Sequence, residues 1–285
     1  MNQNKINEKQ NEDLMLKLQF AARQRYNQAE IHNVLIWGAC ILSALSVLLP
    51  QNQPWFFLVP LTFDVIAFLL NCYLNKYVSE AALLRGYFDA YVLNIGLSDY
   101  TEADIRHLKS LAINTANKHT AQFRIQSANT GKDTPPGVRD WYEISSLLPE
   151  QDAQYECQNQ NLWWNTTLYQ KRCHHFMFII ITVLILTAIT KHLGVVSREL
   201  SVALLCSAGI LIRCAERISA NKKYYDISQK IHGAHTVLQN HKNPIQLKTV
   251  QNMINERRAI PILESNTLHK KLAKQLTEKY HELIS

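Results

Sequence analysis

The feature that most constrains the fold is an apolar run from Phe176 to Thr190, with the sequence FMFIIITVLILTAIT. Counted back to Cys173, it gives eighteen residues without Asp, Glu, Lys or Arg. A helix of that length spans about 27 Å, close to the bilayer hydrocarbon core of about 30 Å. A buried helix of a soluble protein usually keeps a polar stripe, whereas this run is apolar on every face. We therefore predict a membrane-spanning helix here, in preference to a buried core helix.

Three further stretches are apolar enough to be judged by the same standard: Val34–Leu49, Trp55–Leu70 and Glu199–Ile212. The first two are separated by a short polar break with two prolines, Pro50 and Pro54, which favours a tight hairpin. The stretch that ends at Ile212 is the weakest candidate by length. Together the four stretches predict two transmembrane hairpins.

The distribution of Lys and Arg predicts the orientation of these hairpins. Five of the 30 precede the first span, ten lie between the second and third spans, and thirteen follow the fourth. The two hairpin loops hold none and two, respectively. Since cytosolic flanks are enriched in Lys and Arg, we expect both termini and the central region in the cytosol.

The predicted fold class is an all-α membrane protein whose transmembrane helices extend into a cytosolic helical stalk and cap. Helix start signals support this outside the spans, since Thr101 is followed three residues later by Asp104, and Asn243 precedes Pro244. The expected regions are an N-terminal cytosolic helix (1–33), a first transmembrane hairpin (34–73), a cytosolic helical region (74–172), a second hairpin (173–212) and C-terminal cytosolic helices (213–285).

Three cytosolic stretches carry a resemblance to a known family. They are AALLRGYFDAYVL (Ala81–Leu93), PPGVRDWY (Pro135–Tyr142) and CQNQNLWWN (Cys157–Asn165). In this order, with two transmembrane hairpins around them, they resemble the SMODS-associating four-transmembrane effector family. The resemblance implies a membrane effector of bacterial anti-phage signalling, linked to a nucleotidyltransferase that makes a cyclic oligonucleotide. It implies that this nucleotide activates the effector, which then breaches the inner membrane.

The motif Arg139-Asp140-Trp141-Tyr142 follows a Pro-Pro-Gly turn and is our first candidate for ligand binding. Arginine offers a planar fork to a phosphate, and aromatic rings stack on bases. The alternative is structural: an Arg–Asp pair and two aromatic rings that hold a loop against the helical stalk.

Trp163 and Trp164 are the second candidate, because they lie about ten residues before the third span and could stack on a ligand. The alternative is that both tryptophans pack between stalk helices.

Asp64 lies in the middle of the second predicted span. A carboxylate at the bilayer centre costs about 2.5–3.5 kcal/mol on insertion scales, so it normally faces a partner or water. It could line a pore shared by the subunits of a homo-oligomer. It could instead hydrogen bond between helices, for example with Ser43 or Ser207.

Signatures of catalysis are missing from the sequence, which has eight glycines and no GxSxG, P-loop or HExxH motif. We expect neither an enzyme nor a cofactor, and no metal at the histidine pairs His174-His175 and His232/His235. The chain has a formal charge of +7 but no basic run of the kind that binds DNA or RNA polymers.

Three functions remain open at this point. The first is an effector that responds to a cyclic oligonucleotide by permeabilising the membrane. The second is a constitutive channel or transporter-like protein with an acidic site at Asp64. The third is a membrane-anchored scaffold whose cytosolic cap binds another protein.

Overall fold

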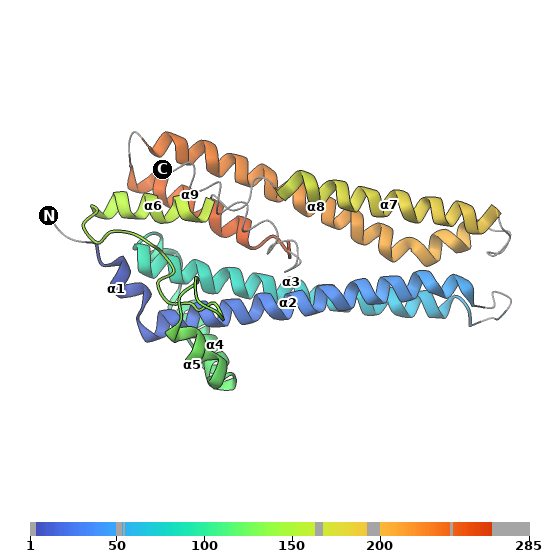
Figure 1. Ribbon diagram of the computed structural model, residues 1–285, viewed down its shortest axis with the longest axis horizontal. Helices are drawn as coiled ribbons and strands as arrows, with labels where there is room; N and C mark the ends of the chain where they lie inside the picture. Colours follow the sequence, from blue (N-terminus) through green and yellow to red (C-terminus); the bar gives the residue numbers. More distant parts are fainter. Residues whose placement is uncertain are drawn as a thin grey trace. The chain divides into compact units, whose positions relative to one another are not determined.

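The structure is a computed structural model that describes residues 4–49, 53, 55–162, 168–192, 200–239 and 242–263 (Figure 1). These residues form helices and connecting loops and contain no strand. Their one extended pairing is an isolated bridge between Thr130 and Arg139. The predicted all-α fold class is therefore confirmed. Residues 264–285, the end of the predicted C-terminal helices, lie outside the described part.

The helices differ widely in length, from 5 residues in α1 to 39 in α8. In chain order they are α1 (Ile6–Gln10), α2 (Asp13–Leu45), α3 (Leu58–Leu93), α4 (Glu102–Lys118), α5 (Thr120–Ala128), α6 (Glu150–Leu162), α7 (Leu168–His192), α8 (Leu200–Leu238) and α9 (Pro244–Arg258). Two short 3-10 turns, η1 (Ser46–Leu48) and η2 (Leu97–Asp99), follow α2 and α3.

Three of these helical segments are long and apolar enough to cross a membrane: Asp13–Leu48, Leu58–Leu93 and Arg172–Ile189. They overlap most of three of the four predicted spans. The fourth prediction, Glu199–Ile212, falls on the beginning of α8, and Glu199 itself lies outside the described residues. The arrangement as four spans thus stays a prediction. Three of the described helices are long and apolar enough to fit a membrane protein.

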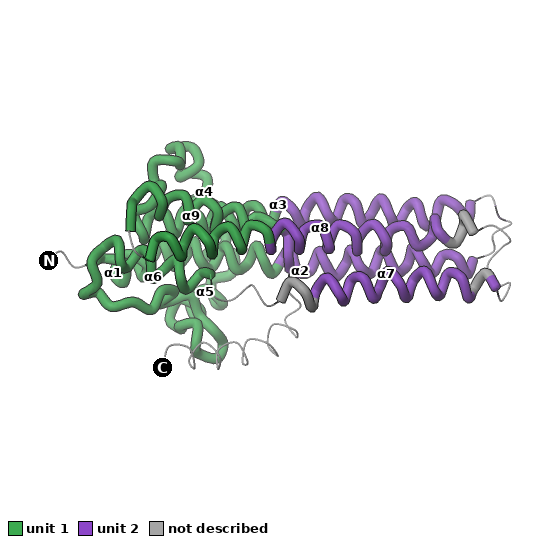
Figure 2. The backbone as a smooth tube through the Cα atoms, turned by 90° about the horizontal axis from the view of Figure 1, so that it is seen from above, with its two compact units in different colours: residues 1–27, 77–166, 226–260 green, residues 28–76, 167–225, 261–285 purple. Residues whose placement is uncertain are grey.

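The chain divides into two compact units (Figure 2). The first unit contains residues 1–27, 77–166 and 226–260, and the second contains residues 28–76, 167–225 and 261–285. Helices α2, α3 and α8 each have residues in both units.

The second unit exposes large apolar side chains. Val34 in α2 is 68% exposed, Phe68 in α3 is 67% exposed and Phe178 in α7 is 67% exposed. In water, so much unburied apolar surface would be unfavourable at about 25 cal/mol per Å², whereas in a bilayer it faces hydrocarbon. The outer surface of this unit is thus suited to lipid.

Small and polar side chains are among the buried residues of the second unit. Ser43 and Ser46 on α2 are buried, and Ser43 lies 3.4 Å from the carbonyl oxygens of both Pro60 in α3 and Cys206 in α8. The Ser46 hydroxyl donates to the Ser43 carbonyl over 2.6 Å. Small residues allow helices in lipid to approach closely, and they occupy that position here.

Arg213 ties three helices of the second unit together directly after the fourth predicted span. Its guanidinium is buried and donates to Asn71 of α3 over 2.7 Å and to Asn33 of α2 over 2.9 Å. Glu216, one turn further along α8, accepts from the same group at 3.1 Å. The charge is thereby compensated at the point where the apolar stretch of α8 ends.

In the first unit, α9 packs on the part of α3 that follows the second span. A Cβ atom at Gly86 of α3 would come within 2.7 Å of the Tyr100 hydroxyl and 3.4 Å of Asn255 in α9. Glycine at this position therefore permits the close approach. Helix α6 joins the same cluster, because Gln158 donates to the carbonyl of Leu247 in α9 over 2.9 Å.

Candidate ligand site

The loop that carries the Arg139–Tyr142 motif folds back on the end of α5. The Gly137 amide donates to the Thr130 carbonyl over 2.6 Å, and the Arg139 amide donates to the Asn129 carbonyl over 3.0 Å. A Cβ at Gly137 would lie 1.7 Å from the Asn129 carbonyl oxygen. The loop can therefore close this tightly because residue 137 has no side chain.

Two residues of the motif hold the loop in place. The Nε of Arg139 donates to the Ser127 carbonyl over 3.0 Å. Asp140 has a φ of 49°, in the left-handed region that non-glycine residues rarely adopt. A reciprocal pair of hydrogen bonds with Asn11 supports this conformation, at 2.7 Å to the Asp140 carboxylate and 3.1 Å from the Asp140 amide.

Tyr142 points into the interior of the first unit. Its backbone exchanges two hydrogen bonds with the side chain of Gln10, at 2.8 and 3.1 Å. Its hydroxyl donates to Asp89 over 2.6 Å. Burial, together with the nearby charge of Asp89, raises the pKa of Tyr142 well above its ordinary value. These contacts favour the structural alternative for Tyr142, although ligand contact at this motif is untested.

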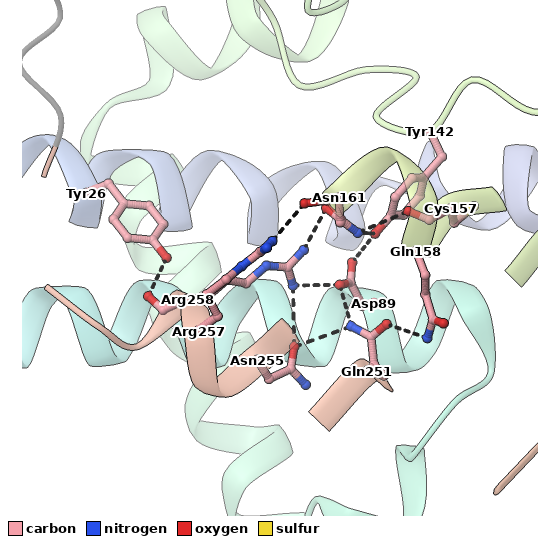
Figure 3. A network of polar contacts seen from close by, with 10 residues as sticks. All are labelled: Tyr26, Asp89, Tyr142, Cys157, Gln158, Asn161, Gln251, Asn255, Arg257 and Arg258. Atoms are coloured by element: carbon pink, nitrogen blue, oxygen red, sulfur yellow. Dashed lines mark hydrogen bonds and ion pairs between the residues drawn. The ribbon is translucent and has the colours of Figure 1, made fainter. Parts of the chain in front are cut away.

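Asp89, on α3, is the centre of a buried polar network (Figure 3). Its carboxylate accepts hydrogen bonds from Tyr142, from Gln251 over 2.8 Å and from Arg258 over 2.6 Å. Burial opposes the charge of Arg258, but the charge of Asp89 and its hydrogen bond, together with Tyr142 and Tyr26, raise the pKa of Arg258 above its ordinary value. Arg258 therefore keeps its charge inside the unit.

Asn161, near the end of α6, closes this network. Its amide donates to the Tyr142 hydroxyl over 3.0 Å, and its side-chain oxygen accepts from Arg258 over 3.1 Å. Its backbone carbonyl accepts from Arg257 over 2.7 Å. Asp89, Tyr142 and Asn161 come from the three stretches that carried the family resemblance, and the fold brings these stretches together at one carboxylate.

Trp141 lies at the edge of the same region and is partly buried. The guanidinium of Arg85, on α3, lies 4.9 Å from the centroid of its ring. The same guanidinium lies over the ring of Tyr26 of α2, whose centroid is 5.0 Å away. Sequence reasoning singled out Trp141 but missed Arg85, whose signal was its place in the Ala81–Leu93 stretch.

Asp64 lies in the second unit, against the backbone of Gly209 in α8. A Cβ built at Gly209 would be 2.6 Å from the Asp64 Oδ1 atom and 3.5 Å from the Cys40 sulfur. Ser43 of α2 lies beside the carboxyl group, and Oδ1 is buried without a hydrogen bond from the described residues. The structure of a single chain places the carboxylate between helices and does not test pore lining.

The remaining sequence candidates are separate from these sites. Trp163 and Trp164 lie outside the described residues. His235 stacks on Tyr155 at a centroid distance of 4.0 Å. Within the described ranges, no three His, Cys, Asp or Glu side chains are grouped as a metal site would need.

Comparison with known families gives a match over nearly the whole chain. The family model of the SMODS-associating 4TM effector domain matches residues 4–282, nearly the whole chain. No curated protein and no solved structure matches the chain. The match extends over helices of both units, including the buried network around Asp89 and the three apolar segments.

Proposed function

The chain belongs to the SMODS-associating 4TM effector domain family, and from this we propose that it is a membrane effector of bacterial anti-phage defence. A cyclic oligonucleotide, made by a partner nucleotidyltransferase, activates it. The response is permeabilisation of the inner membrane, which arrests growth or kills the cell. The family name supports the link to SMODS-type signalling, and the apolar segments of α2, α3 and α7 support the action on a membrane.

The proposal rests mainly on the long helices that have residues in both units. Helices α2, α3 and α8 each have residues in the hydrogen-bonded first unit and in the second unit with its apolar exterior. Packed helices can shear past one another in small steps when a ligand changes their contacts. A ligand that binds the open arrangement more tightly than the closed one would shift the population toward opening.

In the proposed assembly, α2, α3, α7 and the beginning of α8 form four spans, with both chain ends in the cytosol. One subunit packs its own helices together and leaves little room for water, so several subunits line the path. Asp64 is the acidic residue within the second span, and a ring of such carboxylates would favour cations. The proposed ligand contacts in the motif are Arg139 and Trp141, and Trp163 and Trp164 are proposed as stacking residues.

The first experiment asks whether the purified protein binds a cyclic oligonucleotide at all. Thermal unfolding would be followed with a panel of cyclic di- and trinucleotides, and linear dinucleotides of the same bases serve as controls. A ligand at a hundred times its Kd stabilises the folded state by about 2.7 kcal/mol. We expect at least one cyclic compound to raise the unfolding midpoint and its linear counterpart to have no effect. Equal responses to both, or none to either, would contradict the proposal.

The second experiment tests the role of Asp64 with liposomes that contain the wild-type protein or Asp64→Asn. The variant keeps size and polarity but removes the charge, so ligand-dependent flux should lose preference for cations while ligand affinity is unchanged. Equal passage of cations, anions and large dyes in both proteins would instead indicate general bilayer disruption. Steady cation flux without any ligand would favour the constitutive channel.

A further inference from the structure

Arg85 is a cation with no ion-pair partner among the described residues. Its guanidinium lies over the rings of Tyr26 and Trp141, at 5.0 and 4.9 Å from their centroids. Its Nε atom is buried and has no hydrogen-bond partner among the described residues. A guanidinium has five N–H donors, and a buried charge is normally paired because its desolvation is costly. The ring contacts hold Arg85 in place but give the buried Nε no acceptor.

The carboxylates nearby are already engaged with other arginines. Arg258 forms its 2.6 Å ion pair with Asp89. Arg25, one residue before Tyr26, pairs with Glu80 at 2.8 Å, and both side chains are 19% exposed. In the described part of the first unit, no carboxylate forms an ion pair with Arg85. The charge of Asp89 acts on Arg85, but that carboxylate forms its ion pair with Arg258.

A second arginine adds to this positive charge. Arg23, one turn before Tyr26 on α2, donates to the carbonyl oxygens of Pro136 over 2.7 Å and Gly137 over 2.8 Å. Burial, and then the charge of Arg85, lower the pKa of Arg23 to about 10. Arg23 is therefore still charged at neutral pH, close enough to Arg85 to feel its repulsion. An anion bound near both would remove that repulsion.

We propose that Arg85, together with Arg23, binds a phosphate group of the activating cyclic oligonucleotide. The inference rests on the proposed function and names a residue of its site that the sequence did not indicate. A phosphodiester carries a fixed negative charge and accepts two parallel hydrogen bonds from the edge of a guanidinium.

The position of this anion site explains how binding could act on the helices. Arg23 and Tyr26 belong to α2, Arg85 belongs to α3, and Trp141 belongs to the loop that closes on α5. A phosphate held there would fix α2 against α3. Both of these helices also have residues in the second unit.

The test compares Arg85→Gln with the wild-type protein in the cyclic-oligonucleotide panel. Losing a charge-assisted phosphate contact should weaken the affinity about tenfold to a hundredfold. The matched control is Arg124→Gln, an exposed arginine on α5 in the same unit, which should bind like the wild type. Arg85→Lys keeps the charge but not the planar fork, and should fall between the two. Circular dichroism establishes that each variant is folded.

A second probe, inorganic pyrophosphate, separates failure of this inference from failure of the proposed function. Stabilisation of the wild type by pyrophosphate, lost in Arg85→Gln, supports the anion site even if no cyclic compound binds. If a cyclic compound binds wild type and Arg85→Gln with equal affinity, the inference is overturned and the proposed function stands. If pyrophosphate stabilises neither protein and no cyclic compound binds, both are overturned.

Discussion

Asp89 and Asp99 each accept from a basic side chain over 2.6 Å, but their surroundings differ. Asp89 is fully buried with Arg258, whereas the side chains of Asp99 and Lys248 are 44% and 40% exposed. Removing one partner of a buried pair costs about 3–5 kcal/mol, because the other charge stays behind unpaired. An exposed pair contributes about 0–1 kcal/mol. We therefore expect Asp89→Asn to lower the unfolding midpoint strongly and Asp99→Asn to leave it nearly unchanged.

The measurement is thermal unfolding of both variants in detergent, followed by circular dichroism. If the unfolding midpoint falls equally in the two variants, burial does not decide how much an ion pair contributes to stability here. The Asp89 variant should also lose the order of the Tyr142 loop, since the Tyr142 hydroxyl donates to this carboxylate. Faster proteolysis at the loop would report that change.

His235 makes the stability of the first unit depend on pH. Its ring stacks on Tyr155, and burial lowers its pKa below the ordinary value of 6.5, with a smaller contribution from His232. The unfolded chain therefore binds the proton more readily than the folded one. The contribution of His235 to the stability of the first unit is present above pH 6.5. It is lost as the pH falls toward the lowered pKa that His235 has in the folded state.

Replacing His235 by Phe keeps the ring stack and removes the titration. The variant should lose less stability than the wild type between pH 7.5 and pH 5.5, as measured by unfolding midpoints at both values. His232→Gln, at an exposed position on the same helix, is the control and should keep most of the wild-type slope, because His232 contributes less to the lowered pKa of His235 than burial does. If the unfolding midpoint of His235→Phe changes with pH as much as that of the wild type, His235 is not the source of the pH dependence.

At the scale of the elements, we predict that position 209 of α8 must be glycine, because Asp64 packs directly against it. A Cβ there would approach Oδ1 to 2.6 Å, whereas a Cβ at Gly38 of α2 would meet nothing within 4 Å. Gly209→Ala should therefore destabilise the second unit. Gly38→Ala should be neutral or stabilise it by up to about 1 kcal/mol through helix propensity. Unfolding in detergent measures both.

The double variant Asp64→Ala/Gly209→Ala provides the internal check for this contact. Removing the carboxylate makes room for the new methyl group, so the second substitution should cost less than it does alone. Additive losses would show that the two side chains do not meet, and the place of Asp64 against α8 would be abandoned.

The sequence predicted where helices lie far better than which residues contact one another in the fold. Thr101 and Asp104 form the capping box at the start of α4, and Asn243 caps α9 ahead of Pro244, because these signals are local. The partners of Asp89 are 53, 162 and 169 residues away in the chain. No spacing rule connects such positions, so the network and the stacked Arg85 emerged from the fold. The fourth span stays a prediction because its apolar stretch is short.

At the scale of the whole molecule, the orientation in the membrane is predicted by the Lys and Arg counts. A cysteine introduced at Gln53, in the first hairpin loop, should react with an impermeant maleimide in intact cells. A cysteine at Lys132, in the first unit, should react after permeabilisation alone; the Lys132 side chain is 77% exposed, so burial does not protect it. The reverse pattern would invert the topology.

The most direct test of the central claim is ligand-triggered efflux from liposomes that contain the purified protein. A cyclic oligonucleotide that binds should release an entrapped small ion or dye from wild-type liposomes and from those with Arg124→Gln. Arg85→Gln should require a concentration about tenfold to a hundredfold higher, in step with its weaker binding. Release that is the same with and without nucleotide, or no release at saturating nucleotide, would contradict a membrane effector controlled from the first unit.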